Sequence, residues 1–180
     1  DRLIEIYEAL AAHGYREVGQ EYLQNVLDTA KQLDAYDSGR IYYYLGEYQK
    51  AYLALDEARD KGGADSYLYL GRAYAATGDY NYASSVYNNY LSKQGPNAEI
   101  YNELGLCEMA KKEYQNALAA FQAGKQIEGN SLMQTLCFNE IVAYEYLEDY
   151  QQAEVLMNAY LQNYPDDQTA IREQQFLSTR

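Results

Sequence analysis

The chain has 180 residues and a formal net charge of −13, because 27 acidic side chains outnumber 14 lysines and arginines. The acidic charge is spread along the chain without a basic block, which argues against binding to nucleic-acid phosphates or to an anionic membrane surface. No apolar run reaches the roughly 18 residues that a membrane-spanning helix needs, so direct membrane insertion is not expected.

Tyrosine is unusually frequent, with 23 residues against three phenylalanines and no tryptophan, and its positions show an internal repeat. In chain order, a short polar turn precedes Tyr15, Tyr48, Tyr80, Tyr114 and Tyr150. These tyrosines are 33, 32, 34 and 36 residues apart, and the last four are each followed by an alanine three residues later and a large apolar residue seven later. A period near 34 residues predicts a helical-repeat solenoid.

Each repeat is predicted to be an antiparallel pair of helices. The clearest first helix carries one face made of Tyr67, Leu70, Gly71 and Tyr74. Gly71 lacks a side chain and lets a neighbouring helix approach closely, which offsets its cost of about 1 kcal/mol within a helix. Gly78 is expected to end this helix in the left-handed conformation, and Asp79 to open the second. On the second helix, the small side chain of Ala83 leaves room for larger side chains of the first helix. Pro96 is expected to end the second helix.

These residues resemble the tetratricopeptide repeat motif, in which an aromatic residue, leucine-glycine and tyrosine are followed on a second helix by alanine and an aromatic residue. The resemblance covers nearly the whole chain. It implies an all-α, right-handed superhelical solenoid of antiparallel helix pairs in a single domain, with about five repeats and a C-terminal capping helix. The expected repeats are 1–31, 32–63, 64–97, 98–130 and 131–165, and the capping helix is 166–180.

The two ends of the predicted solenoid differ. After Pro165, Asp167 can cap a last helix whose apolar residues would cover the end of the stack. Leu3, Ile4 and Ile6 have no equivalent cover at the other end. Either the native protein continues upstream or this end packs on a partner, including another copy of the chain.

Chemistry-bearing residues are sparse, and no catalytic, metal or cofactor site is expected. His13 is the only histidine and precedes Gly14 at a predicted helix end, where a capping or surface role is expected. Cys107 and Cys137 lack the spacing of zinc or redox motifs and are expected to be free, small core residues. Motifs for phosphate-binding loops or hydrolase nucleophiles are absent from the sequence. The chain is therefore not expected to be an enzyme.

The resemblance implies that first helices line a concave groove. The expected groove residues are Tyr36, Arg40, Tyr43, Tyr44, Leu68, Arg72, Asn102, Leu106, Met109, Phe138, Val142 and Tyr146, with Tyr7 and Glu145 on the same faces. Arg40 and Arg72 either form ion pairs with acidic neighbours or contact a ligand. Tyr36 and Leu68 stand where the relatives that bind chaperone tails have a lysine, which disfavours that ligand.

The predicted function is a non-catalytic scaffold that binds a peptide or a partner helix in this groove, the peptide being partly apolar and bearing a carboxylate. One alternative is an assembly subunit of a larger complex, which could be in a bacterial envelope. Another is the docking domain of a larger enzyme or regulator. Because Asp1 is not an initiator methionine, a bacterial extracytoplasmic location after removal of a leader is favoured, with the cytoplasm as the alternative.

Overall fold

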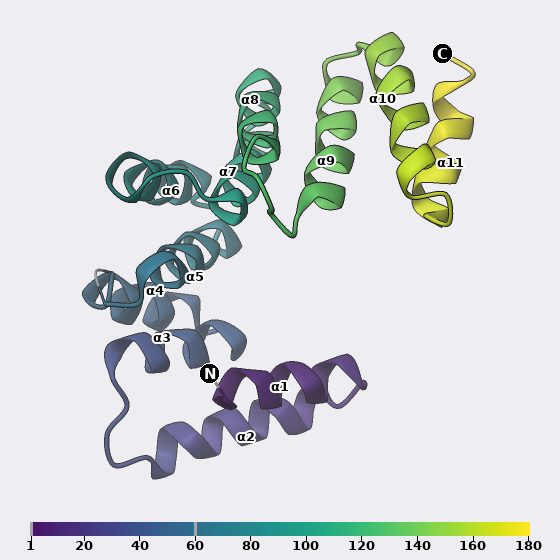
Figure 1. Ribbon diagram of the computed structural model, residues 1–180. Coiled ribbons are helices and arrows are strands. Elements are labelled where there is room, and N and C mark those ends of the chain that lie inside the picture. Colours follow the sequence, from purple (N-terminus) through teal and green to yellow (C-terminus); the bar gives the residue numbers. More distant parts are fainter. Residues whose placement is uncertain (1, 60) are drawn as a thin grey trace. The chain divides into compact units, whose positions relative to one another are not determined.

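The computed structural model describes residues 2–59 and 61–180, which form eleven α-helices and no strand (Figure 1). The predicted all-α class is confirmed. The helices are α1 Arg2–Ala12, α2 Arg16–Thr29, α3 Ala35–Tyr44, α4 Tyr48–Glu57, α5 Gly63–Ala76, α6 Tyr80–Gln94, α7 Ala98–Ala110, α8 Tyr114–Lys125, α9 Met133–Tyr146, α10 Tyr150–Asn163 and α11 Gln168–Leu177.

The chain divides into two compact units, one up to Val86 and one from Tyr87 onward, so that α6 begins in the first and ends in the second. In the first unit, α1 and α2 lie side by side in opposite directions (Figure 1), and α3 pairs with α4 in turn. In the second unit, α7 pairs with α8, and α9 pairs with α10. Consecutive helix pairs are the repeating element that the tyrosine period predicts.

The turn between the two helices of a pair has the same backbone in four repeats. The residue two positions before the repeat tyrosine has a positive φ, as at Gly46 (79°) and Gly78 (83°). The amide of the following residue donates a hydrogen bond to a carbonyl of the first helix, for example from Asp79 N to Tyr74 O at 3.0 Å. This arrangement is the glycine-capped helix end that was expected at Gly78. Lys112 (64°) and Glu148 (60°) hold the same conformation without being glycine.

Small residues lie where the helices of a pair cross. A Cβ added to Gly105 would lie 2.3 Å from Phe121 Cε1, and one added to Gly39 would lie 2.5 Å from Leu55 Cγ. Ala83 and Ala117, on the second helices, have no exposed surface. The packed position predicted at Ala83 is confirmed, and the tight surroundings of Gly39 and Gly105 leave no room for added volume.

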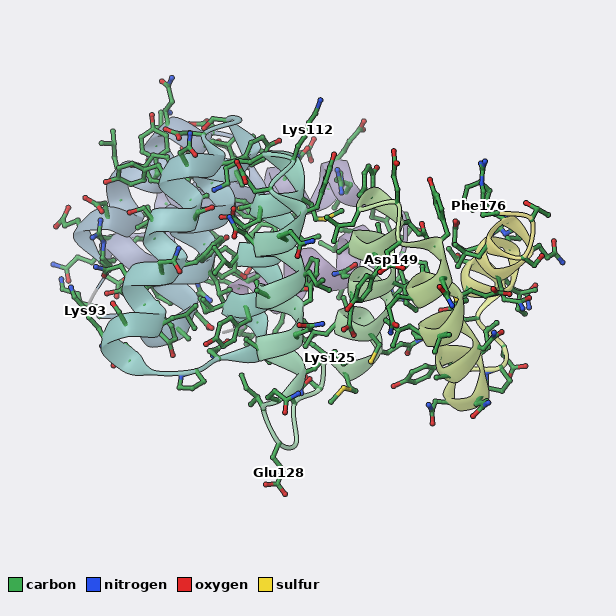
Figure 2. All side chains as sticks on the ribbon, turned by 90° about the horizontal axis from the view of Figure 1, so that it is seen from above. Lys93, Lys112, Lys125, Glu128, Asp149 and Phe176 are labelled. Atoms are coloured by element: carbon green, nitrogen blue, oxygen red, sulfur yellow. The ribbon has the colours of Figure 1, made fainter. Side chains whose placement is uncertain are left out.

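The last helix covers an apolar cluster in the second unit. Asp167 caps α11 by accepting hydrogen bonds from the amides of Thr169 and Ala170. The cluster beneath contains Ile141, Ala153, Met157, Tyr160, Ala170 and Leu177. Figure 2 shows Phe176 on this helix and Glu128 at the tip of the α8–α9 connection, pointing away from the helices. The predicted C-terminal helix is therefore confirmed.

At the N-terminal end, Ile4 was expected to lie uncovered, but the structure buries it. It is buried in a cluster with Tyr7, Leu23 and Ile41, within its own unit. Of the three apolar residues considered there, Ile6 is the exposed one, at 37%. Packing of α1 on α2 and α3 provides this cover, because the stripe that carries Ile4 and Tyr7 faces the next helices.

Candidate functional site

A row of tyrosines crosses three first helices of the N-terminal unit. Tyr7 of α1 lies 4.8 Å from Tyr44 of α3, measured between ring centroids. Tyr69 of α5 lies 5.8 Å from Tyr44 and 5.5 Å from Tyr43. The rings are tilted or edge-on to one another, the arrangement that aromatic quadrupoles favour. We call Tyr7, Tyr43, Tyr44 and Tyr69 the tyrosine row.

The hydroxyl of Tyr44 connects this row to an acidic residue. It donates to Glu8 Oε1 at 2.6 Å, and it lies 3.0 Å from the hydroxyl of Tyr69. Burial, together with these two hydrogen bonds, raises the pKa of Tyr44 far above its ordinary value. Tyr44 therefore keeps its proton at physiological pH and donates it in the hydrogen bond to the Glu8 carboxyl group.

Arg40 is occupied within its own unit. Its side chain is 4% exposed, and its Nη2 lies 2.6 Å from Asp37 Oδ1. Its guanidinium also lies 4.2 Å from the ring centroid of Tyr36. The Tyr36 hydroxyl donates to Asp65 at 3.3 Å, and burial is the main reason that the pKa of Tyr36 rises to about 12. Of the two roles considered for Arg40, ion pairing is the one seen here.

The other predicted groove residues of the first unit differ in exposure. Leu68 is buried in α5. Arg72 is half-buried, and its guanidinium lies 5.8 Å from the ring centroid of Tyr69. Tyr43 and Tyr44 are half-buried, so each ring keeps some surface accessible. Among the predicted residues of these first helices, Tyr43, Tyr44 and Arg72 therefore keep accessible surface, and Arg40 and Leu68 do not.

In the second unit, the predicted residues lie on α7 and α9. Asn102 is buried and accepts a hydrogen bond from Asn139 at 2.9 Å, which joins the two first helices. Leu106 and Tyr146 are 43% and 57% exposed. Half-buried positions are held by Met109, Phe138 and Val142. This unit thus exposes an apolar surface, and the half-buried Glu145 on α9 is the charged residue among the positions predicted for it.

Sequence reasoning missed three contributors to these surfaces, Glu8, Tyr69 and Asn139, and the buried Tyr160 that lies beneath Phe138. Tyr160 lies 5.7 Å from Phe138 between ring centroids, and its hydroxyl donates to Asp167 at 2.6 Å. Tyr69 directly follows the predicted Leu68, and Asn139 directly follows the predicted Phe138. Neighbouring positions on a helix differ by about 100° in direction, so the choice between them depends on helix rotation.

The groups capable of other chemistry are isolated. Among residues 2–59 and 61–180, no three His, Cys, Asp or Glu side chains gather as metal ligands would. His13 is exposed at the end of α1, with Nδ1 2.8 Å from the Ala9 carbonyl. Cys107 and Cys137 are both free thiols, and burial raises the pKa of Cys107 to about 12. In the described part of the chain, no helix combines the length and apolar character that crossing a bilayer requires.

Comparison with known proteins agrees with this architecture. The family model for the tetratricopeptide repeat matches residues 36–83 and 70–130. A thermophilic tetratricopeptide repeat protein of Thermus thermophilus is similar in structure, with a TM-score of 0.74, 16% identity, and coverage of 99% of this chain and 98% of that one. No curated protein gave a significant sequence match.

Two further solved structures are known with binding partners. One is the second tetratricopeptide repeat domain of human RPAP3 in complex with an HSP70 peptide. It gives a TM-score of 0.59 at 17% identity, and the match covers 66% of this chain and 97% of that one. The APC/C hetero-tetramer Cut9–Hcn1 gives a TM-score of 0.65 at 19% identity, covering 99% of this chain and 39% of that one. At these identities the likeness concerns the fold.

Proposed function

Because this chain belongs to the tetratricopeptide repeat family, we propose that it is a protein-interaction module that holds a peptide or a partner helix along the first helices of its repeats. The family is generally a non-enzymatic interaction fold. Among its structural neighbours, the human RPAP3 domain binds an HSP70 peptide and Cut9 assembles with Hcn1. Both precedents favour a function that lies in contacts with other proteins.

The observation that carries the proposal is the accessible aromatic and aliphatic surface of the first helices. In the second unit, Leu106 and Tyr146 are the exposed members, and Met109, Phe138 and Val142 are half-buried. Aromatic residues and methionine are enriched in protein interfaces. The guanidinium of Arg40 is engaged with Asp37 and Tyr36. We therefore expect apolar contacts to carry the larger part of the binding energy.

Site-specific photo-crosslinking tests this proposal. Benzoylphenylalanine is placed singly at Leu106 or Tyr146 on first helices, and at Leu53 or Val155 on second helices, in cells that naturally make the protein. Leu53 and Val155 are 68% and 58% exposed, so all four positions can present the probe. We expect the same partner to be linked from Leu106 and Tyr146 and not from the second-helix positions. Linking only from Leu53 and Val155 would instead favour the assembly-subunit alternative.

A further inference from the structure

Beside the tyrosine row, the first unit has a hollow of about 370 Å³. Its walls come from α1, α3 and the starts of α2 and α4. The side chains that matter for its chemistry are Tyr7, Glu8, Arg16, Tyr43, Tyr44 and Tyr48. We propose that this hollow receives a cationic side chain, arginine or lysine, of the bound partner. The proposal rests on the proposed function and names the chemistry of one contact within it.

The rings around the hollow meet at steep angles. Tyr43 makes an interplanar angle of 77° with Tyr44 and of 57° with Tyr48, at centroid distances of 5.4 and 5.9 Å. Tyr7 and Tyr44 meet at 50°. Rings set at such angles form separate walls and do not stack into one slab. Their faces carry the negative part of the aromatic quadrupole, which attracts a cation placed between them.

Glu8 supplies a formal charge at the same place. Its Oε1 accepts the 2.6 Å hydrogen bond from Tyr44, which holds the carboxylate against the rings. A carboxylate has about four acceptor positions, so one hydrogen bond leaves capacity for a guanidinium or ammonium donor. Charge-assisted hydrogen bonds of this kind are about twice as strong as neutral ones. The aromatic walls and the carboxylate therefore favour the same class of ligand group.

The first unit already uses this interaction within itself. Lys50 lies 5.3 Å from the ring centroid of Tyr42, and Arg72 and Arg40 lie over the rings of Tyr69 and Tyr36. The charges of residues 1–86 also favour a cation, since 8 basic against 14 acidic side chains leave −6. A positively charged partner segment would accordingly be attracted to this unit at long range.

Arg16 is the one group in the hollow that opposes a cation, and it gives the proposal its sharpest test. Arg16 is exposed at the start of α2, and Glu8 is exposed as well, so water and salt screen both charges. If the hollow instead received an anionic group, Arg16 and the tyrosine hydroxyls would be its donors and Glu8 would repel it. Replacing Arg16 should therefore strengthen the binding of a cationic ligand group and weaken the binding of an anionic one.

The experiment uses the full chain, labelled with ¹⁵N, and two tripeptides. One is acetyl-Ala-Arg-Ala-amide, and the other carries citrulline, the uncharged isostere of arginine. We expect the arginine peptide to bind about fivefold more tightly, with amide shifts confined to α1, α3 and the starts of α2 and α4. Glu8→Gln should remove most of that preference, Arg16→Gln should increase it, and the exposed Glu21→Gln should leave it unchanged. Thermal melts verify that each variant is folded.

Equal affinity for the two peptides would overturn the proposal, and so would weaker binding of the arginine peptide in Arg16→Gln. Loss of the preference in Glu21→Gln would show a general charge effect and would overturn it as well. The photo-crosslinking positions Leu106 and Tyr146 lie in the other unit, so partner binding can persist when this contact fails. The two proposals can therefore fail independently.

Discussion

Replacement of Glu145 by glutamine is expected to stabilise the protein above neutral pH. Glu145 lies on α9 and is half-buried, and its Oε1 is buried without a hydrogen-bond partner. Burial, followed by the charge and proximity of Glu173 on α11, raises the pKa of Glu145 to about 7. The folded protein therefore holds a proton at this carboxyl group that the unfolded chain releases at lower pH.

The sign of the pH dependence follows from this difference. The folded pKa of Glu145 is above its ordinary value of 4.5, so its contribution to stability is complete below about pH 4.5 and is lost as the pH rises through about 7. The gap between these two values corresponds to roughly 3 kcal/mol for a fully buried group. Because the side chain is only half-buried, solvent screening reduces the expected effect to about 1–2 kcal/mol.

Glutamine has the shape of the protonated carboxyl group and does not titrate. Glu145→Gln should raise the unfolding free energy by about 1–2 kcal/mol at pH 8, with about half of that gain developing between pH 5.5 and 8. Urea denaturation followed by far-UV circular dichroism at four pH values in this range measures it. Glu128→Gln is the matched control, because Glu128 has the same charge but is exposed at a loop tip (Figure 2).

A constant difference between Glu145→Gln and the parent protein from pH 5.5 to 8 would refute this reasoning. It would mean that Glu145 is already ionised in the folded state. An equal gain in Glu128→Gln would instead assign the effect to the overall negative charge, which is −13.

Three further predictions concern backbone and packing. Lys112→Gly should stabilise the protein by about 0.5–1 kcal/mol in urea denaturation, since Lys112 has a φ of 64° that glycine adopts without strain; a lower midpoint would contradict this. Gly105→Ala should destabilise by about 1–3 kcal/mol, because its Cβ would overlap Phe121; an unchanged midpoint would show that the ring moves freely. A thiol reagent should modify the half-buried Cys137 before the buried Cys107, as mass spectrometry of digests can determine; the reverse order would contradict their burial.

Local patterns were sufficient to predict the helix pairs, the buried small residue Ala83 and the final helix after Pro165. Each depends on spacing within about one repeat, where the geometry of a helix determines which residues share a face. The positive φ of Lys112 and Glu148 was also accessible in principle, because both align with Gly46 and Gly78 in the repeat. The sequence therefore determined the repeating architecture of this chain through short-range physical rules.

The charged and polar contacts of the candidate site were decided by tertiary structure. The sequence left Arg40 with either an ion pair or a ligand. Its contacts with Asp37 and Tyr36 are local to α3, three and four residues apart, and only its burial depends on how α3 packs against its neighbours. The bond from Tyr44 to Glu8 joins residues 36 positions apart, and the approach of Glu173 to Glu145 joins two different helices. A helical period specifies which face is apolar, but the distance between side chains on separate helices depends on the packing between them.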